Sequence, residues 1–483
     1  MLVKNKAIRL MVFNMTDINI ENLKLKFPET EQLLFSNINI SVKKGEKVLL
    51  VGPSGSGKST LLNVMGGLIP KVIHTPVKAD YLDIPNASSY VFQDPDAQFT
   101  MPTVEEELAF ILENQRIAPS LMNNMMTNAL KRIGLDVPLD LSINQLSGGM
   151  KQKLSVAAAL LQEPDTLFLD EPTSMLDDDS AKNLWETILS IWSDLTVVIV
   201  EHRVEYIWDK VDRVILMNDD GEIILDKDPK FVLSHHVDLL NEYGVWHPMS
   251  WNQAPQFVQS NKDGAPLLEI RDMKIDRRGI DILYIDHLHI RSRQWLTLEG
   301  PNGAGKSSFL SALMKLIPHQ GQIIYKNKLV KKTKDIIGDV YPVFQNPELQ
   351  FITHRVYDEI YINMEHRYDE NLAKQKTEDI LKMFSLEHSA HLNPLELSTG
   401  QKRRLSVATA LGGIPDLLLL DEPTFGLDQK NTFFMLELFD ELVKAGTTII
   451  MITHDVNIQT RYPSRRLEIL DGMILEKDTH NVR

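Results

Sequence analysis

The 483-residue chain repeats itself once, and this duplication restricts its fold more than any other feature. Five sequence patterns occur in the same order in both halves: a glycine-rich loop, a Phe-Gln-Asx-Pro segment, a Leu-Ser-x-Gly segment, an apolar run ending in Asp-Glu-Pro, and a histidine. Their reference residues are Gly52, Gln93, Leu146, Asp170 and His202 in the first half, and Gly300, Gln345, Leu397, Asp421 and His454 in the second. Because the spacings also match, we expect the two halves to share one fold.

Charge and composition exclude several classes of protein. The chain has 51 basic and 66 acidic residues, a net charge of −15, which argues against a broad basic surface for nucleic acid or anionic lipid. It has no cysteine, which excludes disulfides, thiolate metal sites and thiol nucleophiles. The first residues lack the apolar core of a signal peptide, and the longest apolar runs are of strand length. We therefore expect a cytoplasmic protein that reaches a membrane only through a protein partner.

Each half is predicted to be an α/β domain built on a mainly parallel sheet, with an antiparallel β part. An apolar run, the glycine loop and an apolar helix form one βα unit. The apolar runs that end at Asp170 and Asp421, and those before His202 and His454, predict buried parallel strands. The stretches that follow Gln93 and Gln345 have helical spacing and predict a helical subdomain inserted in each half.

The composition of the chain indicates where these domains begin and end. We expect an N-terminal extension over residues 1–14, a first domain over 15–246 and a second over 267–483. Residues 247–266 between them are rich in Pro, Asn, Gln and Ser, which is typical of a linker.

The glycine loops have the pattern GxxxxGK[ST], which predicts binding of phosphate groups. Glycines let the backbone wind tightly, so that N–H groups and a helix N-terminus face the anion. The loop residues are Gly52, Pro53, Ser54, Gly55, Ser56, Gly57, Lys58, Ser59 and Thr60 in the first half, and Gly300, Pro301, Asn302, Gly303, Ala304, Gly305, Lys306, Ser307 and Ser308 in the second. The lysines are expected to contact the β- and γ-phosphates. The hydroxyls of Ser59 and Ser307, with Asp170 and Asp421, are expected to hold Mg²⁺.

Three further residues in each half are candidates for catalysis. Glu171 and Glu422 follow the metal-binding aspartates, where a carboxylate can orient or deprotonate the attacking water. His202 and His454 follow the next strand and are expected to sense the γ-phosphate as hydrogen-bond donors. Gln93 and Gln345 are expected to position water or Mg²⁺.

These patterns together resemble the ABC ATPase family: Walker A loop, Q-loop, signature motif, Walker B strand with its glutamate, and switch histidine. The resemblance covers nearly the whole chain twice and implies ATP as the nucleotide, with Mg²⁺. It also implies that two halves pair head-to-tail, each signature motif meeting the other half's Walker A loop. One site would then combine Lys58, Glu171 and His202 with Ser398, Thr399 and Gly400, and the other Lys306, Glu422 and His454 with Ser147, Gly148 and Gly149.

Two positions depart from the family pattern. The first signature motif ends in Met150 instead of glutamine, and the second has Thr399 in place of its first glycine.

Phe27 lies where the family has an aromatic residue that stacks on adenine, 25 residues before Gly52. The same spacing in the second half falls on Ile275, so that site is expected to hold adenine more weakly or to stack it on Arg277.

The Q-loop segments FQDPDAQF and FQNPELQF resemble those of energy-coupling-factor transporter ATPases, which serve vitamin and transition-metal importers. The resemblance implies a transmembrane coupling protein and a substrate-binding membrane protein as partners, at the cytoplasmic face of the membrane. Arginines of the coupling protein would then meet Asp94, Asp96 and Glu348. The length and fusion of the halves favour the subgroup associated with thiamine or its hydroxymethylpyrimidine precursor.

Alternative functions differ in specific sequence features. Tandem ATPases of sugar importers have a similar length, but the two acidic Q-loop segments argue against them. ABC-F translation factors, which act on the ribosome, have a long charged linker between their domains. The predicted linker of this chain, residues 247–266, is short and carries little charge. A non-hydrolysing nucleotide-gated scaffold is disfavoured by Glu171 and Glu422. The histidines, including His235 and His236, show no metal-ligand spacing, so we expect no metal beyond Mg²⁺.

Overall fold

The computed structural model describes residues 16–28, 32–257, 264–277, 279–412 and 415–477. The predicted N-terminal extension lies outside the described residues, as do residues 258–263 of the predicted linker. The chain divides into two compact units. The first comprises residues 1–250 with 428–430, and the second comprises residues 251–427 with 431–483. Each unit contains one copy of the five sequence patterns.

The first unit has a mainly parallel six-stranded sheet in the order β10-β9-β3-β8-β7-β6. Strand β3 is parallel to β8 and β9, β7 is parallel to β6 and β8, and β10 is antiparallel to β9. A second, antiparallel sheet pairs β1 with β2, β4 and β5. The strands of this unit are β1 (Thr16–Leu25), β2 (Phe35–Lys43), β3 (Lys47–Val51), β4 (Val77–Lys78), β5 (Tyr81–Asp83), β6 (Ser88–Val91), β7 (Thr166–Asp170), β8 (Thr196–Val200), β9 (Arg213–Met217) and β10 (Ile223–Lys227).

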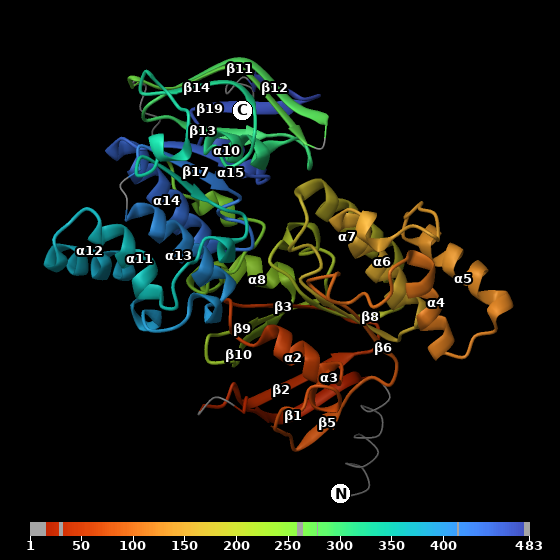
Figure 1. The fold of residues 1–483 in the computed structure, drawn as a ribbon. Coiled ribbons are helices and arrows are strands. Elements are labelled where there is room, and N and C mark those ends of the chain that lie inside the picture. Colours follow the sequence, from red (N-terminus) through yellow and green to blue (C-terminus); the bar gives the residue numbers. More distant parts are fainter. Residues whose placement is uncertain (1–15, 29–31, 258–263, 278, 413–414, 478–483) are drawn as a thin grey trace, which may run out of the picture. The chain divides into compact units, whose positions relative to one another are not determined.

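Helices α4, α5 and α6 of the first unit pack together as the inserted helical subdomain (Figure 1, orange to yellow). Helix α4 begins after Thr103, whose hydroxyl accepts a hydrogen bond from the Glu106 N–H and so caps the first turn. Met122 and Met126 of α5 are buried in this subdomain. The helices of the unit are α2 (Lys58–Met65), α3 (Leu68–Lys71), α4 (Val104–Asn114), α5 (Pro119–Arg132), α6 (Gly148–Leu161), α7 (Asp178–Ile191), α8 (Pro229–His235) and α9 (Val237–Glu242).

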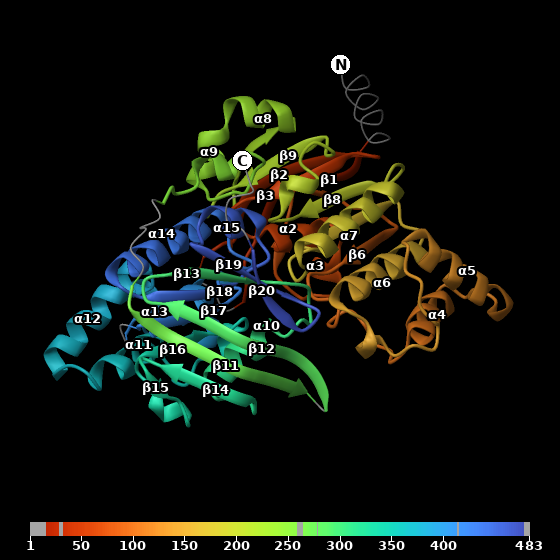
Figure 2. The same cartoon turned by 90° about the horizontal axis from the view of Figure 1, so that it is seen from above.

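The second unit joins its parallel and antiparallel strands into one ten-stranded sheet, in the order β15-β14-β11-β12-β20-β19-β13-β18-β17-β16. One parallel pairing, between Tyr284 of β12 and Met473 of β20, connects the two parts. Figure 2 shows the long β11–β12 hairpin beside β14. The strands are β11 (Pro266–Arg277), β12 (Ile280–Arg291), β13 (Trp295–Glu299), β14 (Gln320–Tyr325), β15 (Lys328–Leu329), β16 (Val340–Val343), β17 (Leu417–Asp421), β18 (Thr448–Ile452), β19 (Arg465–Leu470) and β20 (Met473–Lys477).

The helices of the second unit repeat the plan of the first. They are α10 (Lys306–Leu313), α11 (Val356–Glu365), α12 (Glu370–Met383), α13 (Thr399–Leu411), α14 (Gln429–Ala445) and α15 (Val456–Arg461). Helices α11, α12 and α13 form the inserted subdomain (Figure 1, cyan to blue). Among the described residues, no helix combines the length and apolar character that crossing a bilayer requires. The predicted α/β class, with a helical insertion in each half, is confirmed.

Candidate functional site

Each glycine loop connects a buried central strand, β3 or β13, to a helix, α2 or α10. Gly57 and Gly305, just before the helices, have φ values of 90° and 100°, a conformation that L side chains rarely adopt. A Cβ atom on Gly57 would lie 2.8 Å from the Phe35 ring. Gly55 and Gly303 also have positive φ, but a Cβ there would meet nothing within 4 Å. The loops therefore pack tightly on the protein side and are open on the side where phosphates would lie.

The two loop lysines fold back over their own loops. The Nζ atom of Lys58 donates to the carbonyl oxygens of Gly52 and Pro53, at 2.9 and 2.7 Å. Lys306 makes the same two contacts with Gly300 and Pro301, at 2.7 and 3.0 Å. Burial lowers the pKa of Lys58, although the nearby carboxylates of Glu171 and Asp170 oppose this shift. An ammonium group held in this way is poised to interact with phosphate oxygens.

The residues predicted to hold Mg²⁺ lie together in both halves. Ser59 Oγ donates to Asp170 Oδ1 at 2.7 Å, and Ser307 makes the corresponding hydrogen bond to Asp421. Burial raises the pKa of Asp170 to about 6 and raises that of Asp421. A buried carboxylate beside a hydroxyl is a hard oxygen donor set that fits Mg²⁺ and that a bound cation would stabilise in its charged form.

The two candidate catalytic glutamates have the same strained backbone. Glu171 and Glu422 have φ values of 47° and 51°, in the left-handed region, which costs a non-glycine residue about 1–3 kcal/mol. The strain occurs in both halves, directly after Asp170 and Asp421. Each glutamate N–H donates to the end of the neighbouring strand, to Val200 O at 2.8 Å and to Ile452 O at 3.0 Å. This backbone shape turns the carboxylates toward the switch histidines.

Each switch histidine pairs with the glutamate of its own half. His202 Nε2 lies 3.2 Å from Glu171 Oε1, and His454 Nε2 lies 3.7 Å from Glu422 Oε1. Burial would raise the pKa of Glu171, but the charges of His202 and Lys58 outweigh burial and lower it. Burial likewise disfavours a charged His202, yet Glu171 outweighs it and raises the pKa of the imidazole. Glu171 and His202 thus stabilise each other's charged forms, in which the carboxylate can accept a proton and the imidazolium can donate a hydrogen bond.

The Q-loop glutamines differ between the halves. Gln93 Nε2 donates to Glu171 Oε2 at 3.0 Å, which brings together two residues that lie 78 positions apart. Gln345 is exposed and makes no side-chain hydrogen bond to any residue that the structure describes. The two Q-loop glutamines therefore differ: Gln93 contacts the candidate catalytic glutamate of its half, whereas Gln345 lies exposed.

Both signature motifs begin a helix, and their serines cap it. Ser147 Oγ accepts from the Met150 N–H, and Ser398 Oγ accepts from the Gln401 N–H, each at 3.3 Å. In the second half Gln401 Oε1 also accepts from the Ser398 N–H, at 3.0 Å, which completes a capping box. Met150 has no oxygen for this bond. The departure noted in the first motif thus removes one reciprocal capping interaction.

The sequence patterns did not predict the contacts that connect each signature helix to its Q-loop. Gln152 of α6 is buried and donates to the backbone oxygens of Phe92 and Gln93, at 3.2 and 3.1 Å. The corresponding residue of α13 is Arg403, which is also buried and donates to Phe344 O at 3.1 Å. Burial lowers the pKa of Arg403 to about 10. Only the shared position, five residues after each serine, could have indicated these residues.

The residue before each of these forms an ion pair with the acidic Q-loop segment. Lys151 Nζ lies 2.5 Å from Asp96 Oδ1, and Lys402 Nζ lies 2.6 Å from Glu348 Oε1. Two acids predicted to receive arginines of a partner therefore have lysine partners within their own half. Asp94 has another role, since its Oδ1 accepts from the Asp96 N–H at 2.9 Å and shapes the turn.

The residues predicted to hold adenine differ between the halves. Phe27 is about one-third exposed, with 36% of its surface accessible. Ile275, at the equivalent spacing in the second half, is fully buried in β11 and offers no surface for stacking. Arg277 at the end of the same strand is exposed.

The side chains of each half are suited to attack by water on a terminal phosphate. Glu171 can accept a proton from the water, His202 can donate a hydrogen bond to a γ-phosphate oxygen, and Lys58 can stabilise its charge. Mg²⁺, when bound, neutralises charge on the phosphate oxygens. Strand β7 and the loop that follows β8 hold the acids and the histidine at one edge of the sheet.

Comparison with known proteins agrees with this geometry. The sequence model of the ABC transporter family matches residues 35–174 and again residues 285–425. A Bacillus subtilis (strain 168) protein provisionally named as the HMP/thiamine import ATP-binding protein YkoD is 33% identical, covering 94% of this chain and 90% of its own length. A protein of Streptococcus agalactiae serotype V, provisionally named ABC transporter ATP-binding protein SAG1633, is 33% identical, covering 91% of this chain and 87% of its own.

Solved structures show the same fold. A structure of ribosome-bound archaeal Pelota and ABCE1 aligns with a TM-score of 0.66 at 20% identity, covering 94% of this chain and 78% of that one. A complex of the archaeal ribosome recycling factor aABCE1 with stalk protein aP1 aligns with a TM-score of 0.61 at 21% identity, covering 89% and 85%. With two matched domains, and relatives similar over nearly its whole length, the chain belongs to the ABC transporter family as a tandem ATPase that binds and hydrolyses ATP with Mg²⁺.

Proposed function

We propose that the chain is the ATPase subunit of an energy-coupling-factor type importer for a vitamin or related small molecule. Thiamine or its hydroxymethylpyrimidine precursor is the favoured substrate. In this proposal the protein is peripheral, at the cytoplasmic face of the membrane. It drives a transmembrane coupling protein, while a separate membrane protein captures the substrate.

The observation that carries the proposal is the pair of acidic Q-loop segments, one in each half. Each segment follows a strand of the parallel sheet and is tied to the signature helix by a buried side chain and an ion pair. A segment attached in this way can pass a displacement from the nucleotide site to whatever protein docks against it. The similarity to YkoD over 94% of this chain supports the substrate class.

We further propose that both ATP sites hydrolyse, because each half has its glutamate and histidine side by side. By the family resemblance, Ser398 and Gly400 complete the site of Lys58, and Ser147, Gly148 and Gly149 complete the site of Lys306. Binding of ATP would close the two halves and hydrolysis would reopen them. This alternation would supply the motion for transport.

Co-expression with a coupling protein and a small membrane receptor tests the importer function. We expect a membrane complex that takes up labelled hydroxymethylpyrimidine or thiamine in vesicles loaded with ATP. The double variant Lys58→Ala/Lys306→Ala should assemble but lose uptake and ATP turnover together. Stable recovery of the protein with ribosomes and without a membrane partner would contradict the proposal, as would uptake of a sugar by the complex.

A further inference from the structure

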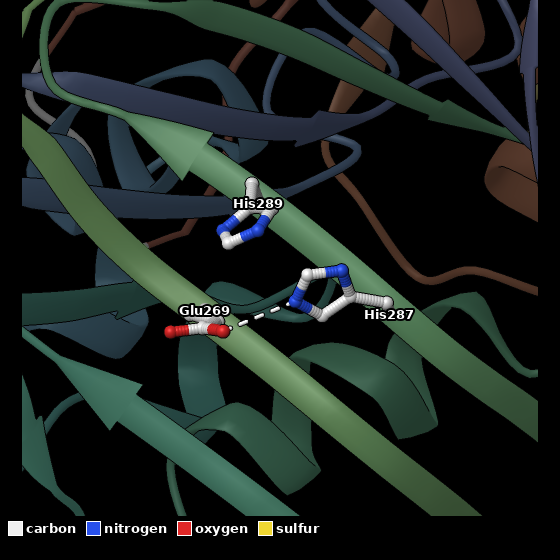
Figure 3. A group of neighbouring side chains, drawn as sticks. All are labelled: Glu269, His287 and His289. Atoms are coloured by element: carbon white, nitrogen blue, oxygen red, sulfur yellow. Dashed lines mark hydrogen bonds and ion pairs between the residues drawn. The ribbon is translucent and has the colours of Figure 1, made fainter.

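Two histidines and one glutamate meet on the solvent-facing side of the β11–β12 hairpin in the second unit. Successive side chains of a strand point to opposite faces, so His287 and His289 of β12 share one face, while Leu288 between them is buried. Glu269 of β11 lies directly opposite His289. Figure 3 shows the three side chains converging from the two neighbouring strands.

The distances fit a metal ion. One ligand atom from each of the three residues can be chosen so that all lie within 4.8 Å of one another. His287 Nε2 is already 3.0 Å from Glu269 Oε1, and the two imidazole rings are 4.1 Å apart between centroids. Metal–ligand bonds of about 2.0–2.2 Å place ligand atoms roughly 3–3.5 Å apart. Because both histidines are exposed, rotation of their side chains can close the remaining gap while the hairpin backbone stays in place.

The surroundings leave the carboxylate able to bind a cation and leave space for further ligands. Arg271 Nε donates to Glu269 Oε1 at 2.6 Å. A carboxylate has about four acceptor positions on its two oxygens, so it can keep this hydrogen bond and still bind a cation. A cavity of about 330 Å³ lies beside the cluster and is lined in part by Glu269, His289 and Asn327. Water molecules in this cavity can complete a coordination shell.

Hydrogen bonds from a neighbouring strand also anchor the backbone beside the cluster. The guanidinium of Arg465 on β19 donates to His289 O at 2.7 Å and to both carboxylate oxygens of Glu476, at 2.9 and 3.0 Å. The strand that supplies both imidazoles is therefore anchored from a neighbouring part of the same sheet. A pre-positioned strand reduces the entropy lost when a metal binds.

We propose that Glu269, His287 and His289 bind one divalent transition-metal ion of the zinc, cobalt or nickel class. Two imidazoles and one carboxylate suit such ions, whereas the serine and aspartate oxygens of the ATP sites suit Mg²⁺. The site differs from our sequence-based expectation of no metal beyond Mg²⁺. Glu269 and His287 are 18 positions apart, so only the antiparallel pairing of the strands brings them together.

A bound ion would cross-link β11 to β12. Because metal that binds only the folded protein shifts the folding equilibrium toward that state, it should stabilise the second unit. The site lies outside the ATP-binding residues, so its effect on stability can be separated from ATP turnover.

Titration of the full-length, nucleotide-free protein with Co²⁺ in excess Mg²⁺ tests the site, because Co²⁺ absorbance reports imidazole ligation. We expect one Co²⁺ per chain and a rise in the thermal unfolding midpoint. His289→Ala and Glu269→Gln should each weaken binding at least about tenfold. Arg271→Gln should strengthen it several-fold, because it removes a competing positive charge. His235→Ala, which changes an exposed histidine outside the cluster, should leave binding unchanged.

Unchanged ATP turnover and unchanged unfolding without Co²⁺ will show that the variants are folded. The proposal is overturned if His289→Ala and Glu269→Gln both bind Co²⁺ as the unsubstituted protein does. It is also overturned if His235→Ala reduces binding as much as they do, or if no Co²⁺ binds in excess Mg²⁺.

Discussion

At the scale of single residues, the two candidate catalytic glutamates share a strained backbone, and Glu171 is also contacted by Gln93. Glu171 is contacted by Gln93 and by His202 at 3.2 Å, whereas His454 lies 3.7 Å from Glu422. Both retain the positive φ that turns the carboxylate into the site. The same local geometry, repeated after 251 residues, is the basis of our proposal that each carboxylate acts in hydrolysis.

We expect Glu171→Gln and Glu422→Gln each to reduce steady-state ATP turnover. The double variant should lose at least about 100-fold, because the general base is removed from both sites. Phosphate release at saturating ATP is the measurement, and Glu186→Gln, on the exposed face of α7, is the matched control. If Glu171→Gln removed all activity and Glu422→Gln changed nothing, hydrolysis at two sites would be wrong.

Glu201, directly before the switch histidine, predicts a pH dependence of stability that belongs to the first half. Burial raises the pKa of this carboxyl to about 7, and the N–H groups of His202 and Arg203 partly oppose the shift. The folded chain therefore binds this proton more tightly than the unfolded chain does. As pH rises from about 4.5 to about 7, the contribution of Glu201 to the unfolding free energy should fall, and it should level off above that range.

Glu201→Gln keeps the hydrogen-bond acceptor but removes the titration. At about pH 8 it should raise the unfolding free energy by about 1–3 kcal/mol, and at about pH 4.5 it should have little effect. Urea unfolding of the two proteins across this range measures the difference. Parallel pH profiles would show that Glu201 does not titrate in this way. The second half has Thr453 at this position, so it offers no equivalent group.

Some residues of the site could be predicted from the sequence and others could not. Ser59 and Asp170 are predictable neighbours, because a glycine loop and an adjacent apolar strand place both at one edge of a parallel sheet. Gln152 and Arg403 were missed, because a glutamine and an arginine on a helix look like surface residues until packing buries them. Glu269 and His289 meet only through strand register, which spacing along the chain does not reveal.

At the scale of elements, the signature helix and the Q-loop form one connected unit in each half. Gln152 and Lys151 of α6 both contact the segment from Phe92 to Asp96. The side chain of Gln152 donates to backbone oxygens of this segment, and Lys151 forms an ion pair with Asp96. Arg403 and Lys402 of α13 repeat the arrangement with different chemistry at the buried position. The connection occurs in both halves although its buried residue is Gln152 in one and Arg403 in the other. We therefore expect it to carry motion between the signature helix and the Q-loop.

Loss of the ion pair should loosen the Q-loop. In Lys151→Ala, backbone amides of residues 93–98 should exchange hydrogen about two- to fivefold faster, as expected for a half-exposed pair worth about 0.5–1 kcal/mol. Lys153→Ala on the same helix is the control, since this lysine contacts Gly134 O instead. Hydrogen exchange followed by mass spectrometry makes the comparison. Equal exchange in the two variants would mean that the ion pair does not hold the loop.

Sequence patterns predicted the elements better than their joining into sheets. Apolar runs and glycine loops predicted buried parallel strands and βα units, because both follow from local residue types. The single pairing of Tyr284 with Met473, which makes one sheet of ten strands in the second unit, depends on a long-range contact with no local pattern. The first unit has separate sheets despite its similar sequence.

At the scale of the whole molecule, duplication and fusion imply that every chain has one copy of each of its two different ATP sites. The halves have diverged around a shared framework. The first half has Phe27, Glu201 and a contact between Gln93 and Glu171. The second half has a complete capping box at Ser398. If each signature motif serves the other half's loop, as the family resemblance implies, the second motif, which has the capping box, acts with the glutamate that Gln93 contacts.

Paired serine variants can test this assignment. In a Glu422→Gln background, the remaining turnover is expected to come from Glu171. Ser398→Ala should then lower that turnover at least about tenfold, because it removes a hydrogen-bond donor to the γ-phosphate, while Ser147→Ala should have a smaller effect. In a Glu171→Gln background the order should reverse. The reverse pattern in both backgrounds would mean that each half uses its own signature motif. Equal effects of the two serines would mean that neither site depends on one motif alone, and the head-to-tail assignment would then be wrong.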